Sequence, residues 1–348
     1  MEKLNWLVFG AGAIGTYIGG SLALHGQGVV FIEQPQMADE LRQRGLRLRL
    51  PDGEHELPNP QVYGSLSEAL AAGPYNIAVF ALKSYDTLAA LQTLASYKDR
   101  LPAFLCLQNG VENEAALSAA LGNENVIPGT VTSAIGRRAV GDIVLERLRG
   151  MGIAQGHPLS ASLAAALAGS GLNAKLYANA AGMKWSKLLT NLLANAIPAI
   201  LDMTPADVLA HPGLYRLEMQ QIGEALRVMH ARRIPVTNLP KTPVQLLAWV
   251  ARNFPLHLSQ PVVQRVAGRG RGAKMPSLHI DLHSGRGKSE VDYLNGAVAR
   301  LGKQSAIDTP INQRLNETLL ALTRGEYPLG TFSHDPDKLI NWLDSQPG

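Results

Sequence analysis

The first half of the chain alternates short apolar runs with stretches of helical periodicity. Apolar runs of strand length occupy residues 4–9, 28–32, 76–82 and 101–107. Helical periodicity lies between them, over residues 14–24, 37–44 and 86–97. The run from Asn76 to Leu82 is almost entirely apolar, which is typical of a parallel strand buried on both faces. Strands that alternate with helices predict a doubly wound parallel sheet.

The pattern changes toward the middle of the chain. A strand at 46–50 and a β-rich stretch over 126–154 are followed by a small helix at 159–168 and a last strand at 173–177. After that point helical periodicity dominates, over residues 180–196, 214–232 and 244–251. Pro198 is expected to end the first of these helices. We therefore predict an α/β domain over residues 1–178 and a helical domain over residues 179–348.

Three glycines with the spacing GxGxxG follow the first predicted strand and open the first predicted helix. The first glycine allows a tight turn, the second lets a pyrophosphate approach the backbone, and the third lets helix and strand pack closely. The N-terminus of that helix offers N–H groups and a positive dipole end to phosphates. The motif predicts a dinucleotide site made by Gly10, Gly12, Ala13, Ile14 and Gly15. The alternative is a tight turn that merely needs glycine.

Glu33 ends the second predicted strand, 18 residues after Gly15. A carboxylate at this position accepts hydrogen bonds from the ribose hydroxyls of an adenosine, and it repels a 2′-phosphate. The residues therefore favour NAD over NADP as the cofactor. The alternative is a solvated Glu33, with the specificity set by Arg42 or Arg44 folding back.

Residues 4–24 imitate a membrane span, because they contain no charged side chain over a length that could cross a bilayer. Five glycines interrupt this stretch, and its pattern changes from strand to helix. It also lacks a basic segment and a cleavage site of the kind that mark a signal peptide. We therefore predict no association with a membrane.

Composition narrows the class of protein. Lys and Arg exceed Asp and Glu by 32 to 28, and the resulting net charge of +4 fits a small acidic substrate but is too weak to argue for nucleic acid. The single cysteine, Cys106, excludes an internal disulfide and a cysteine-built metal site. We expect a reducing, cytoplasmic compartment. A homodimer stays an open alternative, because nothing in the sequence sets the oligomeric state.

Polar residues stand at positions where this kind of fold carries chemistry. Lys83 and Asn109 follow two buried strands, at the edge where doubly wound sheets bind ligands. Lys187, Asn191 and Asn195 are spaced i, i+4 and i+8, which places an ammonium and two amides along one face of the predicted helix. The alternative for Lys83 and Asn109 is that they are ordinary polar residues of loops. The alternative for the second group is hydrogen bonding to a neighbouring helix.

The segment from Gly268 to Lys288 is rich in glycine and basic residues. It lacks the interleaved aromatic residues of an RNA-binding tract, so we expect a mobile basic loop over an anionic ligand. His279 and His283 lie four residues apart within it, as metal ligands on a helix can. No other cluster of ligands accompanies them in the sequence, so no metal site is predicted.

The segment Ser289-Glu290-Val291-Asp292 opens the next predicted helix. Ser289 is expected to cap that helix, with Asp292 bonding back to Ser289 as in a capping box. Glu290 in the first turn suits the helix dipole. This capping role is the alternative to any role of Glu290 in a ligand site.

Taken together, these motifs resemble the ketopantoate reductases (2-dehydropantoate 2-reductases) along almost the whole chain. The matching segments are GAGAIG at 10–15, FALKSYD around Lys83, LQNG around Asn109, KWSKLLTNLLANAI around Lys187, and PSL with SEVDYLNGAV around Ser277 and Glu290. The resemblance implies an α/β fold class, with an N-terminal Rossmann-type doubly wound parallel sheet, an all-helical C-terminal domain and an active site in the cleft between them. It implies hydride transfer from NAD or NADP to the ketone of a small 2-keto acid, and it names ketopantoate, a precursor of pantothenate.

The resemblance also implies roles for individual residues. Lys187 matches the general acid of the family, and substrate contacts are implied for Asn191, Asn195, Ser277 and Glu290. Lys83 and Asn109 match residues near the nicotinamide end of the cofactor. An ammonium suits this chemistry, because hydride arriving at a ketone carbon leaves an alkoxide that needs a proton.

Two features depart from the family. Most members use NADPH and carry a basic residue where this chain has Glu33, so the residue and the resemblance disagree about the cofactor. Lys274 stands where many members have a substrate-binding asparagine, and the segment from Ser277 to Glu290 is slightly longer than usual. Reduction of a different keto acid or of an imine is therefore one alternative function. A non-catalytic dinucleotide sensor and an RNA-binding protein are two others.

Overall fold

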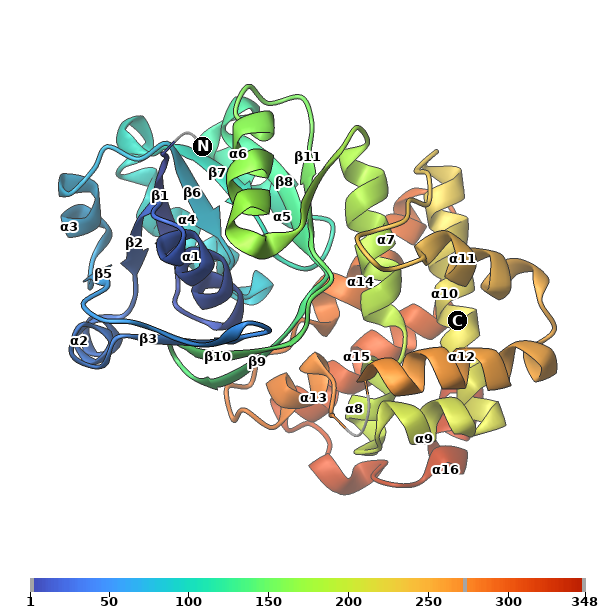
Figure 1. Cartoon of the computed structure of the whole chain (residues 1–348). Helices are drawn as coiled ribbons and strands as arrows, with labels where there is room; N and C mark the ends of the chain where they lie inside the picture. The colour runs from blue at the N-terminus through green and yellow to red at the C-terminus, as the bar shows by residue number, and fades with distance from the viewer. Residues whose placement is uncertain (1–2, 272–273, 346–348) are drawn as a thin grey trace. The chain divides into compact units, whose positions relative to one another are not determined.

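The computed structural model describes residues 3–271 and 274–345, with the backbone alone for residues 266–271. The chain forms two compact units, each of which can be followed in Figure 1. The first runs to Lys184 and includes the segment Asn238–Thr242, and the second takes Trp185–Thr237 and the chain from Pro243 onward. The sequence suggests a boundary after residue 178. The division instead falls within helix α7 (Ala180–Leu192), because its first turns are held by the first unit.

The larger sheet of the first unit has eight strands in the order β12-β11-β8-β7-β6-β1-β2-β5. Their bounds are β1 Asn5–Phe9, β2 Gly28–Ile32, β5 Gln61–Tyr63, β6 Ile77–Phe80, β7 Ala103–Cys106, β8 Val126–Val131, β11 Met151–Ala154 and β12 Ala174–Tyr177. Among these strands the neighbours pair in parallel, except that β11 runs antiparallel to β8. The predicted doubly wound parallel sheet is confirmed in its main part, and one edge is mixed.

The mixed edge follows from the connection between β8 and β11. The chain there forms β9 (Ala134–Ala139) and β10 (Asp142–Arg147), which pair antiparallel, instead of a crossover helix. A parallel partner would need such a crossover, so β11 returns antiparallel. These two strands join β3 (Leu46–Leu50) and β4 (Gly53–Leu57) in a separate four-stranded sheet, β4-β3-β10-β9.

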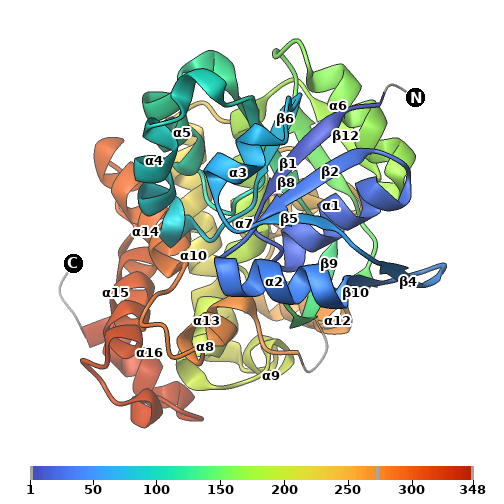
Figure 2. The same cartoon turned by 90° about the vertical axis from the view of Figure 1, so that its left-hand side faces the viewer.

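Helices cover both faces of the larger sheet, as Figure 2 shows: α3, α4 and α5 lie on one side and α1 and α6 on the other. The helices of this unit are α1 Ala13–Leu24, α2 Pro35–Arg44, α3 Leu66–Ala71, α4 Thr87–Ala95, α5 Asn113–Leu121 and α6 Ser160–Leu167. A hydrophobic core lies on each face of the larger sheet, and strand β1 contributes to both because its side chains alternate between the faces. Trp6 and Val8 are buried with Ile18 of α1, and Leu7 and Phe9 are buried in the opposite core.

The second unit is helical. Its helices are α7 from Trp185 onward, α8 Ala196–Leu201, α9 Pro205–Ala210, α10 Pro212–Ala231, α11 Val244–Asn253, α12 Leu256–Arg271, α13 Ser277–Leu282, α14 Val291–Gln304, α15 Pro310–Arg324 and α16 Pro336–Ser345. Helix α10 is central, because it contacts α9, α11, α12, α14, α15 and α16. The all-helical prediction for this half is confirmed.

Two expectations drawn from the sequence are resolved here. The segment from Gly268 to Lys288 is not one loop, because the end of α12 and all of α13 fall within it. The uncharged stretch of residues 4–24 divides into β1 and α1. No helix in the described part of the chain combines the length and the apolar character of a membrane span.

Candidate active site

The three glycines of the GxGxxG motif have three distinct environments. Gly10 has φ +85°, a left-handed conformation that side chains rarely adopt. A Cβ on Gly15 would lie 1.9 Å from the carbonyl oxygen of Gly10, so only glycine lets α1 approach the turn this closely. A Cβ on Gly12 would meet nothing within 4 Å. Gly12 is also the N-cap of α1, so the open space at Gly12 lies next to the start of the helix at Ala13 and Ile14. This cradle fits a pyrophosphate.

Glu33 follows β2 and reaches back to this loop. Its Oε1 accepts a hydrogen bond from the backbone N–H of Ala11 at 2.6 Å. Arg42 and Arg44, which could otherwise have folded toward the loop, are engaged elsewhere. Arg42 pairs with Asp39 at 2.8 Å and donates to the carbonyl of Val62, while Arg44 pairs with Glu40 at 3.0 Å and donates to the carbonyl of Val140. The charge beside the loop is therefore a carboxylate.

The segments that carry Lys83 and Asn109 are joined at the carboxyl ends of β6 and β7. The carbonyl of Asn109 accepts from Ser84 Oγ at 3.0 Å and from Asn113 Nδ2 at 2.6 Å. Gln108 Nε2 donates to the carbonyl of Leu82 at 3.0 Å. The structure thus places both predicted residues after the carboxyl ends of β6 and β7, in turns that are hydrogen-bonded to each other.

Lys184 is a buried residue of the first unit that the sequence analysis missed. Its ammonium donates to the carbonyls of Gln108 at 2.7 Å and Gly129 at 3.2 Å, and it pairs with Glu114 at 2.6 Å. Burial alone would lower the pKa of Lys184, but the charge of Glu114, the neighbouring Cys106 and the hydrogen bond to Glu114 together outweigh burial and raise the pKa above the ordinary lysine value. The signal was in the same KWSK motif as Lys187, where Lys184 stands among apolar neighbours.

The helix predicted over residues 180–196 is confirmed from Ala180 to Leu192, but its end is wrong, because the chain breaks after α7 and restarts as α8. Ala194 has φ +48°, and Asn195 is the N-cap of α8. Pro198 does not end a helix; it lies inside the first turn of α8. A proline ring clashes with the carbonyl four residues earlier in a continuous helix, and that residue is Ala194. Lys187 and Asn191 therefore share one face of α7, but Asn195 does not continue their stripe.

A buried carboxylate of α10 holds this break. Glu218, which is fully buried, accepts from the backbone N–H of Ala194 at 2.8 Å and from Gln221 Nε2 at 2.6 Å. Gln221 also donates to the carbonyl of Leu192 at 3.3 Å. Sequence reasoning did not find these residues, since nothing in the local pattern of α10 connects them with a segment more than 20 residues away.

Asn195 links the restart of the chain to α13. Its Nδ2 donates to the carbonyl of Asn191 at 2.9 Å and lies 3.4 Å from Ser277 Oγ, and its Oδ1 accepts from the backbone N–H of Leu278 at 3.2 Å. The alternative interpretation, hydrogen bonding to a neighbouring helix, therefore holds for Asn195. Ser277 is exposed, and Lys187 and Asn191 are half-buried. The structure brings Asn191, Asn195 and Ser277 together.

Glu290 lies at the start of α14, where it is buried and serves as the N-cap residue. Its backbone N–H lies 3.4 Å from Oδ2 of Asp281, a buried carboxylate of α13. Ser289 Oγ accepts from the N–H of Val291 at 3.2 Å, but the N-cap position that the sequence suggests for Ser289 belongs to Glu290. The capping box is wrong, because Asp292 pairs with Arg300 at 2.8 Å instead of bonding back.

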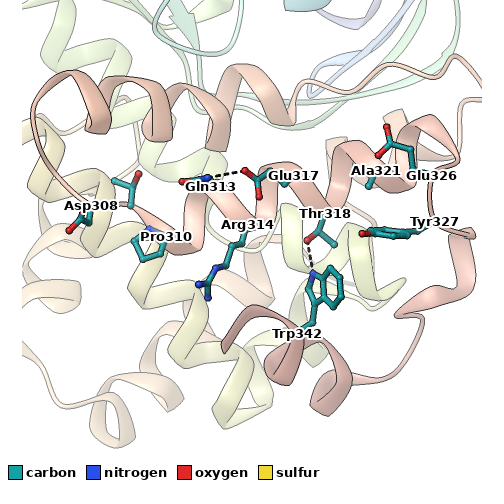
Figure 3. A pocket seen from close by; sticks show the side chains of 11 residues that line it. Asp308, Pro310, Gln313, Arg314, Glu317, Thr318, Ala321, Glu326, Tyr327 and Trp342 are labelled. Atoms are coloured by element: carbon teal, nitrogen blue, oxygen red, sulfur yellow. Dashed lines mark hydrogen bonds between the residues drawn. The ribbon is translucent and has the colours of Figure 1, made fainter. Parts of the chain in front are cut away.

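A cavity of about 660 Å³ lies elsewhere in the second unit, between α15 and α16. Figure 3 shows Thr318 and Trp342 joined across it by a hydrogen bond of 3.3 Å, beside Arg314. The residues that line this cavity include none of the predicted site residues. The site geometry described above is therefore independent of it.

Comparison with known proteins places this geometry in a family. Residues 6–156 match the family model described as ketopantoate reductase PanE/ApbA, and residues 179–323 match its C-terminal counterpart. The 2-dehydropantoate 2-reductase of Halobacterium salinarum is 28% identical over 321 residues, which cover 89% of this chain and 95% of that protein. The 2-dehydropantoate 2-reductase of Pyrococcus horikoshii is 24% identical, with 93% and 97% covered.

Solved structures agree with these matches. The PanE/ApbA family ketopantoate reductase from Ralstonia eutropha JMP134 superposes with a TM-score of 0.77 at 25% identity, covering 92% of this chain and 99% of that one. A D-mandelate dehydrogenase determined with NADH and anilino(oxo)acetate shares the fold, with a TM-score of 0.72 at 23% identity and the same coverage. Because the two family models together span most of the sequence, the chain belongs to the PanE/ApbA family of ketopantoate reductases.

Proposed function

We propose that this protein reduces the ketone of a small 2-keto acid with a nicotinamide cofactor, that NADH is its preferred cofactor, and that ketopantoate is its first candidate substrate. The curated relatives are named for this reaction.

The first unit would hold the cofactor. The space beside Gly12 and the first turn of α1 at Ala13 and Ile14 suit the pyrophosphate, which needs close backbone approach and N–H donors. Glu33 would accept from the ribose hydroxyls of the adenosine and repel a 2′-phosphate. Lys83 and Asn109 would lie toward the nicotinamide, because they stand at the carboxyl ends of β6 and β7.

Lys187 would act as the general acid. A bound nicotinamide supplies the hydride that reaches the ketone carbon. The carbonyl oxygen then gains negative charge, and the Lys187 ammonium stabilises it and gives it a proton, so that the ketone becomes a secondary alcohol. Lys187 is half-buried on α7, and a partly desolvated ammonium would interact more strongly with a developing negative charge than one in bulk water.

Asn191, Ser277 and Glu290 would contact the substrate, but we assign Asn195 a different role. Both N–H groups of the Asn195 amide already have acceptors, at Asn191 and Ser277, and its oxygen accepts from Leu278. An amide has two donors, so little capacity is left for a ligand. Asn195 is therefore a positioning residue that links Ser277 to the backbone of Asn191.

The observation that carries this proposal is that Asn195 links Ser277 to the backbone of Asn191, which lies one helical turn after Lys187 on α7. The test is a panel of 2-keto acids, including ketopantoate and pyruvate, assayed with NADH and with NADPH by the loss of reduced-cofactor absorbance. We expect ketopantoate to give the highest kcat/KM. Turnover of ketopantoate no faster than that of pyruvate would contradict the substrate, and no oxidation of either cofactor with any keto acid would contradict the enzyme.

A further inference from the structure

Three potential metal ligands from two helices converge in the second unit, on side chains that have no part in the proposed reaction. They are Asp202, His279 and His283, whose ligand atoms all lie within 4.8 Å of one another. Asp202 ends α8, and the two histidines lie on and just after α13. These helices lie side by side in both views of the chain (Figures 1 and 2). The sequence shows the two histidines four residues apart, but it does not show the carboxylate 77 residues earlier.

The backbone holds the two imidazoles on one side of α13. The N–H of His283 donates to the carbonyl of His279 at 3.0 Å, so the helical turn continues to His283. The ring centroids are 4.2 Å apart. Two histidines separated by one helical turn present their nitrogens to the same point, as they do in helical metal sites.

Asp202 is directed at the same point by the end of α8. Its backbone is left-handed, with φ +50°, which turns the chain out of the helix. The carbonyl of the preceding residue, Leu201, accepts from the N–H of His334 at 2.8 Å, which holds this end of α8. Asp202 Oδ1 lies 2.8 Å from His279 Nε2.

A hydrogen-bonded His–Asp pair alone would be an ordinary surface contact. The first unit offers such a pair for comparison, since His55 Nε2 lies 3.0 Å from Asp52 Oδ1. The second imidazole is what distinguishes the cluster at Asp202. Two imidazoles and a carboxylate supply three ligands of the kinds that Zn²⁺ prefers, and they leave a further position for water.

We propose that Asp202, His279 and His283 form a binding site for a divalent transition-metal ion of the Zn²⁺ type, which fastens α13 to α8. The side chains of Asp202 and His279 are 47% and 16% exposed, and His283 is exposed, so an ion reaches them from solvent without opening the fold. The opposite ends of the same helices are already joined, because Asn195 at the start of α8 bonds to Ser277 and Leu278 at the start of α13. The metal completes a two-point attachment.

The test uses the full chain without a histidine tag, stripped with a chelator, and titrated with Zn²⁺ alone by isothermal titration calorimetry. We expect one Zn²⁺ per chain at this site. His283→Ala should lower the Zn²⁺ affinity at least about tenfold. Even residues that only hydrogen-bond to metal ligands contribute roughly 10–100-fold to affinity. Asp202→Asn, which removes the charge and tolerates the left-handed backbone, should act in the same direction. His55→Ala is the matched control and should leave the affinity unchanged.

A second readout separates this site from unspecific binding by surface histidines. Zn²⁺ should raise the melting temperature of the parent chain and of His55→Ala, but not that of His283→Ala, since an ion bound to the folded state stabilises it. Equal Zn²⁺ affinity in the parent and His283→Ala, or no Zn²⁺ bound by the parent, would overturn the proposal. Neither readout depends on enzymatic activity.

Discussion

The carboxylate of Glu33 accepts a hydrogen bond from the backbone N–H of Ala11 at 2.6 Å, and this contact fixes a negative charge against the glycine-rich loop. A carboxylate on a flexible side chain could swing away from an approaching phosphate. One that is tied to the loop stays where the 2′ substituent of the adenosine ribose is expected.

This contact leads to the first prediction, a preference for NADH. Because like charges brought together cost several kcal/mol, kcat/KM with NADH should exceed that with NADPH by about tenfold or more. Glu33→Gln keeps an acceptor for the N–H of Ala11 and removes the charge. It should therefore bring the kcat/KM values for the two cofactors closer together, mainly by raising kcat/KM with NADPH. Steady-state kinetics with both cofactors measure this. A parent enzyme that uses NADPH about tenfold better than NADH would refute the argument from Glu33.

Two glycines of the same loop should respond to alanine in opposite ways. Gly15→Ala should destabilise the fold by about 3 kcal/mol or more, because its Cβ would lie 1.9 Å from a backbone oxygen. Gly12→Ala should leave the melting temperature unchanged, because its Cβ meets nothing within 4 Å. It should nevertheless lower the affinity for NADH at least about tenfold, because the added methyl group occupies space that the pyrophosphate needs. Thermal melting and fluorescence titration with NADH measure the two effects. Similar behaviour of the two variants would contradict the roles assigned to them.

Loss of the Lys187 ammonium should affect the chemical step. Lys187→Ala should lower kcat by about 10²–10⁴-fold, the usual contribution of a general acid, while the affinity for NADH stays within a few-fold of the parent. Lys175→Ala, which removes an exposed lysine of β12, is the control and should be fully active. A kcat for Lys187→Ala close to that of the parent would remove this residue from the mechanism.

Asn195→Ala should change substrate affinity and stability together. It leaves the buried N–H of Leu278 without its acceptor, which should cost about 1–3 kcal/mol of the free energy of unfolding. Ser277 would lose its partner, so KM for the keto acid should rise more than kcat falls. Chemical denaturation and steady-state kinetics test this pair of effects. A change confined to kcat would indicate that Asn195 acts on the reaction and not on the position of Ser277.

The buried pair of Lys184 and Glu114 should make stability depend on alkaline pH. The pKa of Lys184 is raised on folding, so its stabilising contribution is fully present below the ordinary value of 10.5 and is lost as the pH rises beyond it. Lys184→Met should cost on the order of 3 kcal/mol, because it leaves Glu114 largely buried without a cation. Melting temperatures measured across the alkaline range should fall above that value in the parent but not in the double variant Lys184→Met/Glu114→Leu. A parent and a double variant with the same pH profile would rule out this contribution.

Much of the first unit could be predicted from the sequence. Strand and helix positions follow from local apolar periodicity, and the roles of Gly10 and Gly15 follow from turn sterics that act over a few residues. The break at Ala194 could also have been predicted, because Pro198 in a continuous helix would clash with the carbonyl of Ala194 four residues earlier. Instead, the continuous periodicity across this segment favoured one helix, and it placed Asn195 wrongly on the same helix face as Lys187 and Asn191.

The sequence by itself determined the alternation of strands and helices in the first unit, the glycine-rich loop and the acidic residue that follows β2, because each depends on residues close together in the chain. Only the tertiary structure decided that Asn195 bonds to α13, that Glu114 neutralises Lys184, and that Asp202 joins His279. Each of these contacts joins segments about 70 or more residues apart, and their partners are chosen by how helices and strands pack to bury apolar surface. Local periodicity sets which face of an element is buried, but it does not specify which distant polar group lies opposite.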